Sequence, residues 1–246
     1  MTASQPHTAP RRRICVGVLA LQGGFHEHLS LLHQAAQHLK SLPADFSFTQ
    51  VRTSEQLAAC DALIIPGGES TTISLIAAQT DLLQNLRDFV KVQKKPTWGT
   101  CAGFILLSQR ANATKKGGQE LIGGLDVCVH RNHFGRQIES FEADLDLPFI
   151  PSSSEKEGER RPFRGVFIRA PVVEEVLGGD SVEVLATLEN RVDRMRAGQS
   201  QAQTRGGSGD IIAARQGNVL GMSFHPELTQ DARIHQWWLS EVVARR

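Results

Sequence analysis

Apolar runs of strand length alternate with helix-like segments through the first half of the chain. Residues 14–21, ICVGVLAL, form a continuous apolar run that predicts a buried strand, and further strand-like runs follow at 46–51, 61–66 and 95–99. Between these runs, apolar residues recur at the spacing of one helix face. Alternation of this kind is typical of parallel βαβ units. The sequence therefore predicts an α/β fold with a mostly parallel central sheet flanked by helices.

The helix-like segments differ in length and regularity. The first has its predicted apolar face on Phe25, Leu29, Leu32, Ala36 and Leu39. Residues 71–93 predict one broken helix or two short ones, and residues 102–110 predict a helix that follows the strand at 95–99. A closing helix is expected to begin near Thr229.

The second half of the chain alternates polar and apolar residues. Residues 124–132 and 136–145 have the two-residue period of half-exposed antiparallel strands. The segments 163–171 and 181–188 predict further strands, and 210–227 predicts a hairpin with QGN at its turn. We therefore expect additional antiparallel strands beside the mostly parallel sheet.

Composition is that of an ordinary globular protein. Of the 246 residues 40% are hydrophobic, and the formal net charge of +1 gives no electrostatic bias toward nucleic acid or a membrane surface as partner. No apolar run approaches the ~20 residues that span a bilayer. The cysteines at positions 15, 60, 101 and 128 have no spacing typical of zinc, and they favour reduced thiols in the cytoplasm.

The polar segments of the chain predict its domain organisation. Residues 1–13 are expected to form a disordered N-terminal tail, and residues 14–246 a single domain. The segments near 151–162 and 189–209 contain too few apolar residues to fold alone, so they are predicted to be surface insertions. The arginines of the second could form a docking patch, although a solvated loop is favoured.

The segment GTCAG places Cys101 where a predicted strand meets a predicted helix. Glycines two positions away on each side give the G-x-nucleophile-x-G pattern of a nucleophile elbow, with cysteine in place of serine. A helix N-terminus favours the thiolate, and the amide of Ala102 would face a developing oxyanion. A buried packing cysteine is the alternative. The glycines and the helical run favour the nucleophile.

His225 and Glu227, in SFHPEL, are candidates for the base and the group that orients it. Pro226 disfavours helical backbone at His225, so the stretch is expected to stay extended, with residues two apart on the same side. By itself, His-Pro-Glu is a common turn and favours a structural role. Together with the cysteine elbow, it predicts a catalytic triad of Cys101, His225 and Glu227.

Four histidines, His26, His28, His33 and His38, lie on the first predicted helix. His26 is too close to His28 for the facing i, i+4 geometry, and no cluster of carboxylates or cysteines accompanies the four. We therefore expect a solvated helix face and no metal site.

A second glycine turn occurs in IIPGGESTT. Gly67 and Gly68 follow a predicted strand and Glu69 opens a predicted helix, an arrangement that lets backbone amides approach a carboxylate or an oxyanion. The segment lacks the lysine of a nucleotide-binding P-loop, and a simple tight turn is the alternative. Arg131 and Arg169 could each clamp a substrate carboxylate or form a salt bridge.

The order of these motifs resembles that of the class I glutamine amidotransferases. The segments that carry the resemblance are ALQGGFHEH, PGGESTT, GTCAG, RNHFGRQ, ESFEADL, FIRAP and SFHPEL. In combination they are similar to one branch, the glutaminase subunits of pyridoxal phosphate synthase, which makes vitamin B6. The resemblance runs from about Ile14 to the C-terminal helix, and it implies the three-layer fold of that family.

The resemblance also implies an activity and a substrate site. Cys101, His225 and Glu227 would hydrolyse L-glutamine to L-glutamate and ammonia, and no cofactor is expected. Glutamine would be held around Gly67, Gly68, Glu69, Arg131, Ile168 and Arg169.

Further roles follow from the same resemblance. The amide of Ala102, with that of Gly67 or Gly68, would form the oxyanion hole. Gln22 would lie near the interface with a TIM-barrel synthase subunit, which would use the ammonia with ribose 5-phosphate and glyceraldehyde 3-phosphate. The N-terminal tail and the two polar insertions depart from compact members of the family, which leaves details of docking open.

Two alternative functions remain at this point. The glutaminase subunit of another amidotransferase, such as one of histidine or nucleotide biosynthesis, would share the triad, so only the surrounding motifs favour the vitamin B6 branch. A regulatory or binding subunit with an idle site is the other alternative. The intact triad residues disfavour it.

Overall fold

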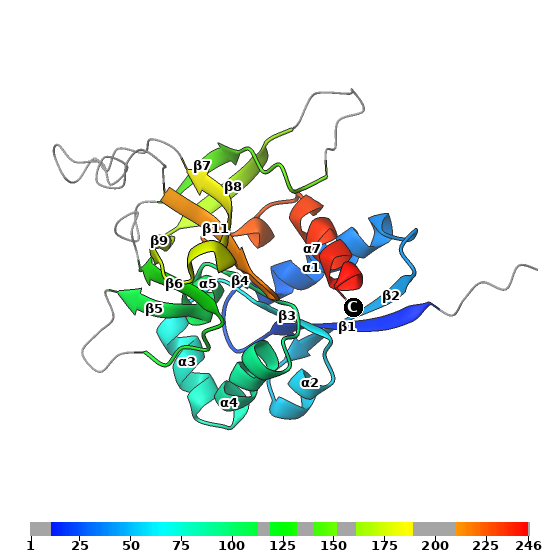
Figure 1. Cartoon of the computed structure of the whole chain (residues 1–246). Coiled ribbons are helices and arrows are strands. Elements are labelled where there is room, and N and C mark those ends of the chain that lie inside the picture. The colour runs from blue at the N-terminus through cyan, green and yellow to red at the C-terminus, as the bar shows by residue number, and fades with distance from the viewer. Residues whose placement is uncertain (1–10, 113–118, 132–139, 152–160, 189–209, 246) are drawn as a thin grey trace, which may run out of the picture.

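The fold is described from a computed structural model, which covers residues 11–112, 119–131, 140–151, 161–188 and 210–245 (Figure 1). The strands of this part of the chain are β1 (Arg12–Leu19), β2 (Ala44–Val51), β3 (Ala62–Ile65), β4 (Thr97–Thr100), β5 (Ser108–Asn112), β6 (Leu125–His130), β7 (Ser140–Leu145), β8 (Phe163–Ile168), β9 (Val172–Val176), β10 (Glu183–Leu188), β11 (Asp210–Gln216) and β12 (Val219–Met222).

The helices connect these strands and cover the sheet. The α-helices are α1 (Phe25–His38), α2 (Ser54–Ala58), α3 (Ser70–Ala78), α4 (Leu82–Arg87), α5 (Ala102–Leu107) and α7 (Arg233–Ala244). A π-helical turn, η1 (Asp88–Val92), extends α4, and two short 3-10 turns are η2 (Gly179–Ser181) and η3 (Pro226–Leu228). The predicted broken helix at 71–93 is thus two α-helices and a π turn.

One large sheet carries most of the strands, in the order β2-β1-β3-β4-β12-β11-β9-β6-β5, with β10 paired to β11. The first five strands of that order are parallel to one another, whereas β11 is antiparallel to β12, β9 to β11 and β6 to β9. A separate antiparallel pair, β7 and β8, forms a second sheet. The predicted α/β fold, with added antiparallel strands, is confirmed.

Helices cover both faces of the large sheet. Figure 1 shows α1 and α7 together on one face, where Leu32 and Leu239 share an apolar core with Val16 of β1. On the other face lie α2, α3, α4 and α5, whose core includes Leu57 and Phe104. The three-layer arrangement implied by the family resemblance is therefore confirmed.

The parallel half of the sheet determines where the site lies. Met222 at the end of β12 is the register partner of Thr100 at the end of β4, so the segments after these two strands emerge side by side. Carboxyl ends of parallel strands meet at one edge of a sheet, which is where ligands bind in open α/β folds. Cys101 and His225, nearly 125 positions apart in sequence, follow these two strand ends.

Several predicted boundaries were wrong. β1 begins at Arg12, inside the segment 1–13 that was expected to be a tail, because Arg12 pairs with Ala44 of β2. The helix expected at 102–110 ends at Leu107, and Ser108 opens β5, which pairs with β6. The closing helix begins at Arg233 and not near Thr229.

Other predictions lie outside the described residues. These include residues 1–10, residues 152–160 of the first expected insertion and the whole second expected insertion, 189–209. Residues 132–139, which hold most of RNHFGRQ and the start of the strand expected at 136–145, lie outside as well. None of the helices in the described part of the chain is both long and apolar enough to cross a membrane.

Candidate active site

Cys101 lies on a sharp turn between β4 and α5. Its backbone has φ 46° and ψ −99°, a conformation that side chains rarely adopt and that is typical of strained functional sites. The flanking glycines make the turn possible. A Cβ on Gly103 would lie 2.0 Å from the carbonyl oxygen of Ile65, and one on Gly99 would lie 2.4 Å from the carbonyl carbon of Gly103. The elbow geometry expected from GTCAG is present.

The contacts of Cys101 hold its thiol at the junction of three elements. Its amide donates to the carbonyl oxygen of Met222 at 2.8 Å, which ties the elbow to β12. Its Sγ lies 3.8 Å from the carbonyl oxygen of Ile168, at the end of β8. Ala102 is the first residue of α5, where a backbone N–H has no acceptor within the helix. That amide is therefore suited to an oxyanion hole.

His225 and Glu227 form a buried pair beside Cys101. The Nδ1 of His225 lies 2.8 Å from Oε1 of Glu227, and the imidazole is close enough to Cys101 for the cysteine to raise its pKa. Pro226 begins η3, so the pair is brought together by a single 3-10 turn and not by the extended backbone that the sequence predicted. The proline is still decisive, because it leaves His225 itself outside helical geometry.

The two ionisable groups shift in opposite directions. Burial, the largest influence on His225, lowers its pKa, but interactions with Cys101 and Glu227 raise the pKa to about 10. Burial of Glu227 raises its pKa, and the opposing effects of His28 and His225 bring the pKa below its usual value. An imidazolium held between a thiol and a carboxylate can supply a proton to a leaving group.

The PGGE turn packs directly on this pair. A Cβ on Gly67 would lie 2.2 Å from Cε1 of His225, so only glycine leaves room for the ring. The carbonyl oxygen of Gly67 accepts from the amide of Gly24, and the amide of Glu69 donates to Oε1 of Gln22 at 2.7 Å. The two glycine turns, ALQGG and PGGE, are thereby joined at one wall of the site.

Glu69 and Arg131 form the polar side of the same wall. Oε2 of Glu69 accepts from the amide of Thr72 and caps α3, while Oε1 lies 3.3 Å from Nη2 of Arg131. The same guanidinium nitrogen donates to Oγ1 of Thr71 at 3.2 Å. Hydrogen bonds from Thr72 lower the pKa of Glu69, although burial acts in the opposite direction and is the largest single influence.

The remaining predicted site residues lie at the end of β8. Ile168 ends that strand and faces Cys101 through its carbonyl oxygen. Arg169 follows with φ 47°, a second strained non-glycine backbone beside the site. Ile168 and Arg169 thus lie at the strand end that faces Cys101.

The prediction for the N-terminal histidines was wrong at one position. His26, His33 and His38 are exposed, as expected, but His28 is fully buried, with Nε2 3.3 Å from Oε2 of Glu227. A helix periodicity would have found it, because Leu31, Leu32 and Ala35 lie three, four and seven positions on and form the buried face. His235 of α7, which no sequence pattern singles out, is buried against His28.

No metal centre accompanies these histidines. Within the described ranges, no group of three or more His, Cys, Asp or Glu side chains could hold a metal ion. The cysteines of this part of the chain are free thiols, and Cys60 and Cys128 are buried away from solvent.

Comparison with known proteins decides the family. The SNO glutamine amidotransferase family matches residues 18–244 of this chain. The chain belongs to that family. The match includes both glycine turns, the cysteine elbow and the His-Pro-Glu segment, so the arrangement described above is that of a family member along nearly its whole length.

Relatives and a solved structure agree with this assignment. The chain is 45% identical over 229 residues to a probable pyridoxal 5′-phosphate synthase subunit PDX2 of Arabidopsis thaliana, covering 91% of this chain and 84% of the relative. It is 42% identical over 224 residues to the pyridoxal 5′-phosphate synthase subunit PdxT of Herpetosiphon aurantiacus, covering 91% and 98%. A crystal structure of a glutamine amidotransferase superposes with a TM-score of 0.67 and 39% identity, covering 93% and 98%.

Proposed function

We propose that this chain is the glutaminase subunit of a pyridoxal 5′-phosphate synthase, which hydrolyses L-glutamine to L-glutamate and ammonia. Membership of the SNO glutamine amidotransferase family supports glutamine as the substrate. Relatives at 42–45% identity that are named pyridoxal 5′-phosphate synthase subunits support the vitamin B6 branch over the other amidotransferases.

One observation carries the proposal. Cys101 lies on a strained elbow and raises the pKa of the neighbouring His225, whose Nδ1 is held 2.8 Å from Oε1 of Glu227. The nucleophile, the base and the orienting carboxylate thus lie next to one another in space, in that order. Nucleophilic acyl transfer requires this arrangement. A regulatory subunit with an idle site would have no need for the strained elbow.

The first half of the reaction cleaves the amide. The Cys101 thiolate attacks the side-chain carbonyl carbon of glutamine, and the carbonyl oxygen becomes an oxyanion next to the amides of Ala102 and of Gly67 or Gly68. When the tetrahedral intermediate collapses, the C–N bond breaks and His225 gives its proton to the leaving nitrogen. Ammonia departs, and a glutamyl thioester remains on Cys101.

The second half releases glutamate. His225, now neutral, removes a proton from water, and the resulting hydroxide attacks the thioester carbonyl. The C–S bond breaks, Cys101 returns as the thiolate and His225 is again protonated. Glu227 holds Nδ1 of the ring throughout, which keeps Nε2 directed at the reacting atoms.

The substrate and partner assignments extend the same proposal. Gly67, Gly68, Glu69, Arg131, Ile168 and Arg169 are assigned to the glutamine site. Gln22 is assigned to the interface with a TIM-barrel synthase subunit that receives the ammonia. Its hydrogen bond to the amide of Glu69 supports this role, because a partner that displaced the Gln22 side chain would act directly on the PGGE turn.

The test is glutamine hydrolysis by the full chain with and without its cognate synthase subunit. We expect ammonia release that depends on the partner, together with pyridoxal 5′-phosphate formation from glutamine. Cys101→Ala should lower ammonia release by ~10³-fold or more and leave the circular dichroism spectrum unchanged. A Cys101→Ala protein that releases ammonia at the parental rate would contradict the proposal.

A further inference from the structure

Behind the triad lies a row of fully buried polar side chains that the proposed mechanism does not use. His28 of α1, Thr100 of β4 and His235 of α7 are each 0% exposed. His28 Nδ1 lies 3.0 Å from Nε2 of His235, and its own Nε2 lies 3.2 Å from Oγ1 of Thr100. The row reaches the triad through Nε2 of His28, which lies 3.3 Å from Oε2 of Glu227.

Glu227 is therefore approached by an imidazole on each oxygen. Oε1 is bonded to Nδ1 of His225, whereas Oε2 is buried and has no hydrogen-bond partner within standard geometry in the described part of the chain. A buried carboxylate oxygen without a donor is unfavourable. His28 Nε2 is placed to serve that oxygen at the long end of hydrogen-bond distance.

The protons of the two buried histidines can be assigned from their contacts. Burial, the first cause for each ring, lowers the pKa of His28 and of His235, so each carries a single ring proton. If His235 donates from Nε2 to Nδ1 of His28, the proton of His28 is on Nε2 and faces Glu227 and Thr100. In the reverse arrangement, the lone pair of His28 Nε2 would face the carboxylate.

The outer end of the row favours the first arrangement. Nδ1 of His235 is buried and has no hydrogen-bond partner among the described residues. In the reverse arrangement Nδ1 of His235 would carry a proton and would be a buried donor without an acceptor. The lone pair of His28 Nε2 would at the same time face the Glu227 carboxylate, which is also unfavourable. Trp98 packs edge-on against both rings, with centroids 5.4 Å from His28 and 4.9 Å from His235, and so restricts their rotation.

We propose that His28, held in one tautomer by His235, is a positioning residue for the triad that fixes the rotation of Glu227. With Oε2 held by His28, Oε1 stays directed at Nδ1 of His225, and the imidazole stays aligned with Cys101. This inference rests on the proposed glutaminase function, since His28 has nothing to position if Glu227 has no catalytic role.

The matched test compares His28→Gln with His28→Asn. The amide nitrogen of Gln extends about as far as Nε2 of histidine, so it can still donate to Glu227, whereas that of Asn reaches only the position of Nδ1. Both replacements are polar and cannot ionise. We expect His28→Asn to lower kcat for glutamine by ~10-fold or more, with KM within about twofold, and His28→Gln to recover most of the loss.

The pH profile of kcat provides a readout that loss of packing would not move. The ionisable groups that face His28 are Glu227 and His225 from the segment after β12, His235 from α7 and Glu27 from α1 itself. Removing the donor from Oε2 raises the pKa of Glu227, so activity should be lost at a higher pH on the acid side in His28→Asn. His38→Asn, on the exposed end of α1, is the control and should match the parent.

The outcomes separate this inference from the function beneath it. If the parent with its synthase subunit releases no ammonia, the proposed function fails. If the parent is active and His28→Asn has the parental kcat, or if His28→Gln loses as much as His28→Asn, the positioning role is overturned. If His28→Asn does not fold, His235→Leu takes its place: a lowered kcat with KM unchanged supports the role, and a parental kcat overturns it.

Discussion

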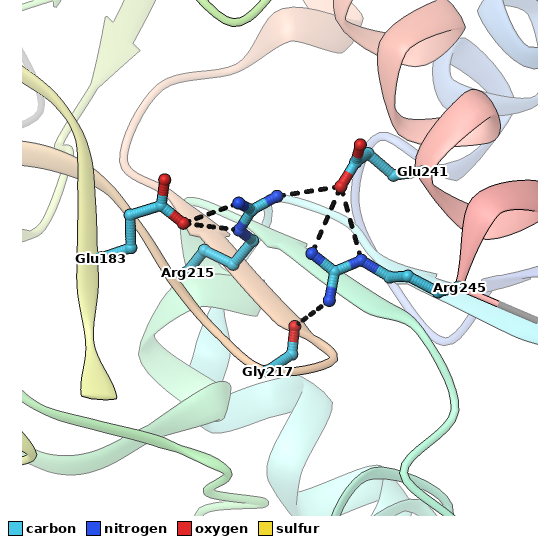
Figure 2. Close-up of polar contacts among 5 residues, drawn as sticks. All are labelled: Glu183, Arg215, Gly217, Glu241 and Arg245. Atoms are coloured by element: carbon cyan, nitrogen blue, oxygen red, sulfur yellow. Dashed lines mark hydrogen bonds and ion pairs between the residues drawn. The ribbon is translucent and has the colours of Figure 1, made fainter. Parts of the chain in front are cut away.

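The charged groups at the carboxyl ends of β4 and β12 are buried, whereas the charged groups near the amino end of β12 are partly exposed to solvent. The side chains of Glu227 and His225 are 1% and 10% exposed, so water cannot readily replace the contact between them. At the opposite end, Arg215 lies between Glu183 and Glu241, and Arg245 contacts Glu241 and the carbonyl oxygen of Gly217 (Figure 2).

The exposed network is redundant where the buried one is not. Both nitrogens of Arg215 that face Glu183 bond the same carboxylate oxygen, and Glu241 receives contacts from two arginines (Figure 2). The Glu183 side chain is 53% exposed, so water can replace any of its contacts. The comparison teaches that similar polar contacts on one sheet contribute differently to stability and activity. Burial excludes water as an alternative partner at one end of the sheet and not at the other.

The largest effect is expected from adding one methyl group at the buried end. Gly67→Ala would place a Cβ 2.2 Å from Cε1 of His225, so the catalytic ring or the PGGE turn must shift to admit it. A displacement of about 1 Å in a catalytic group costs ~10²-fold in rate, so we expect a loss of that size in kcat for glutamine. Stopped assays of ammonia release in the presence of the synthase subunit measure it.

Gly217→Ala is the control at the exposed end. Gly217 has φ 52° and no atom within 4 Å of an added Cβ, so alanine there meets backbone strain and no clash. We expect a loss of about 1–2 kcal/mol in the free energy of unfolding with parental glutaminase activity. Equal activity of the two variants would contradict the assignment of Gly67 to the wall of the site.

Much of this comparison could be predicted from the sequence, because local chemistry carries it. The elbow is visible in GTCAG since glycines must flank a nucleophile on a tight turn, and His225 and Glu227 are separated by one proline in SFHPEL. The parallel sheet could also be predicted from local patterns, because strand-length apolar runs alternate with helix-like segments. Short local patterns were also missed: Thr53 and Gln56 form a capping box that begins α2.

The rest depends on contacts between distant segments. AGFILLSQR continues a helical pattern, yet Ser108 begins a strand because β6, far along the chain, is available as its partner. His28 reads as one polar residue among four on its helix, and only the packing of α1 against α7 and η3 buries it beside Glu227. The residues around position 28 do not predict that His28 contacts Glu227 or His235.

The second prediction concerns the protonation of His225. Burial lowers its pKa, but Cys101 and Glu227 raise the pKa to about 10, so the ring should stay protonated through neutral pH in the parent. Cys101→Ala removes the partner that contributes most to the increase, and the ring should then titrate at a lower pH. Nuclear magnetic resonance titration of the imidazole, in both proteins, measures the difference.

The same shift has a consequence for stability with a defined sign. Because the folded pKa of His225 lies above its unfolded value of 6.5, the stabilisation is complete below pH 6.5 and is lost as the pH rises through about 10. The stability advantage of the parent over Cys101→Ala should therefore shrink between these values. Identical titration midpoints for His225 in the two proteins would show that Cys101 does not raise the pKa of His225.

The smallest effect is expected where the network is exposed. Glu241→Gln removes the carboxylate that Arg215 and Arg245 share, but Arg215 keeps Glu183 and Arg245 keeps the carbonyl oxygen of Gly217 (Figure 2). Exposed ion pairs contribute about 0–1 kcal/mol each, so denaturant unfolding should show a loss in that range that fades in high salt. Glutaminase activity should equal that of the parent. A loss of several kcal/mol, or one that does not depend on salt, would mean that this end of the sheet relies on its charges as the other end does, and the contrast based on burial would fail.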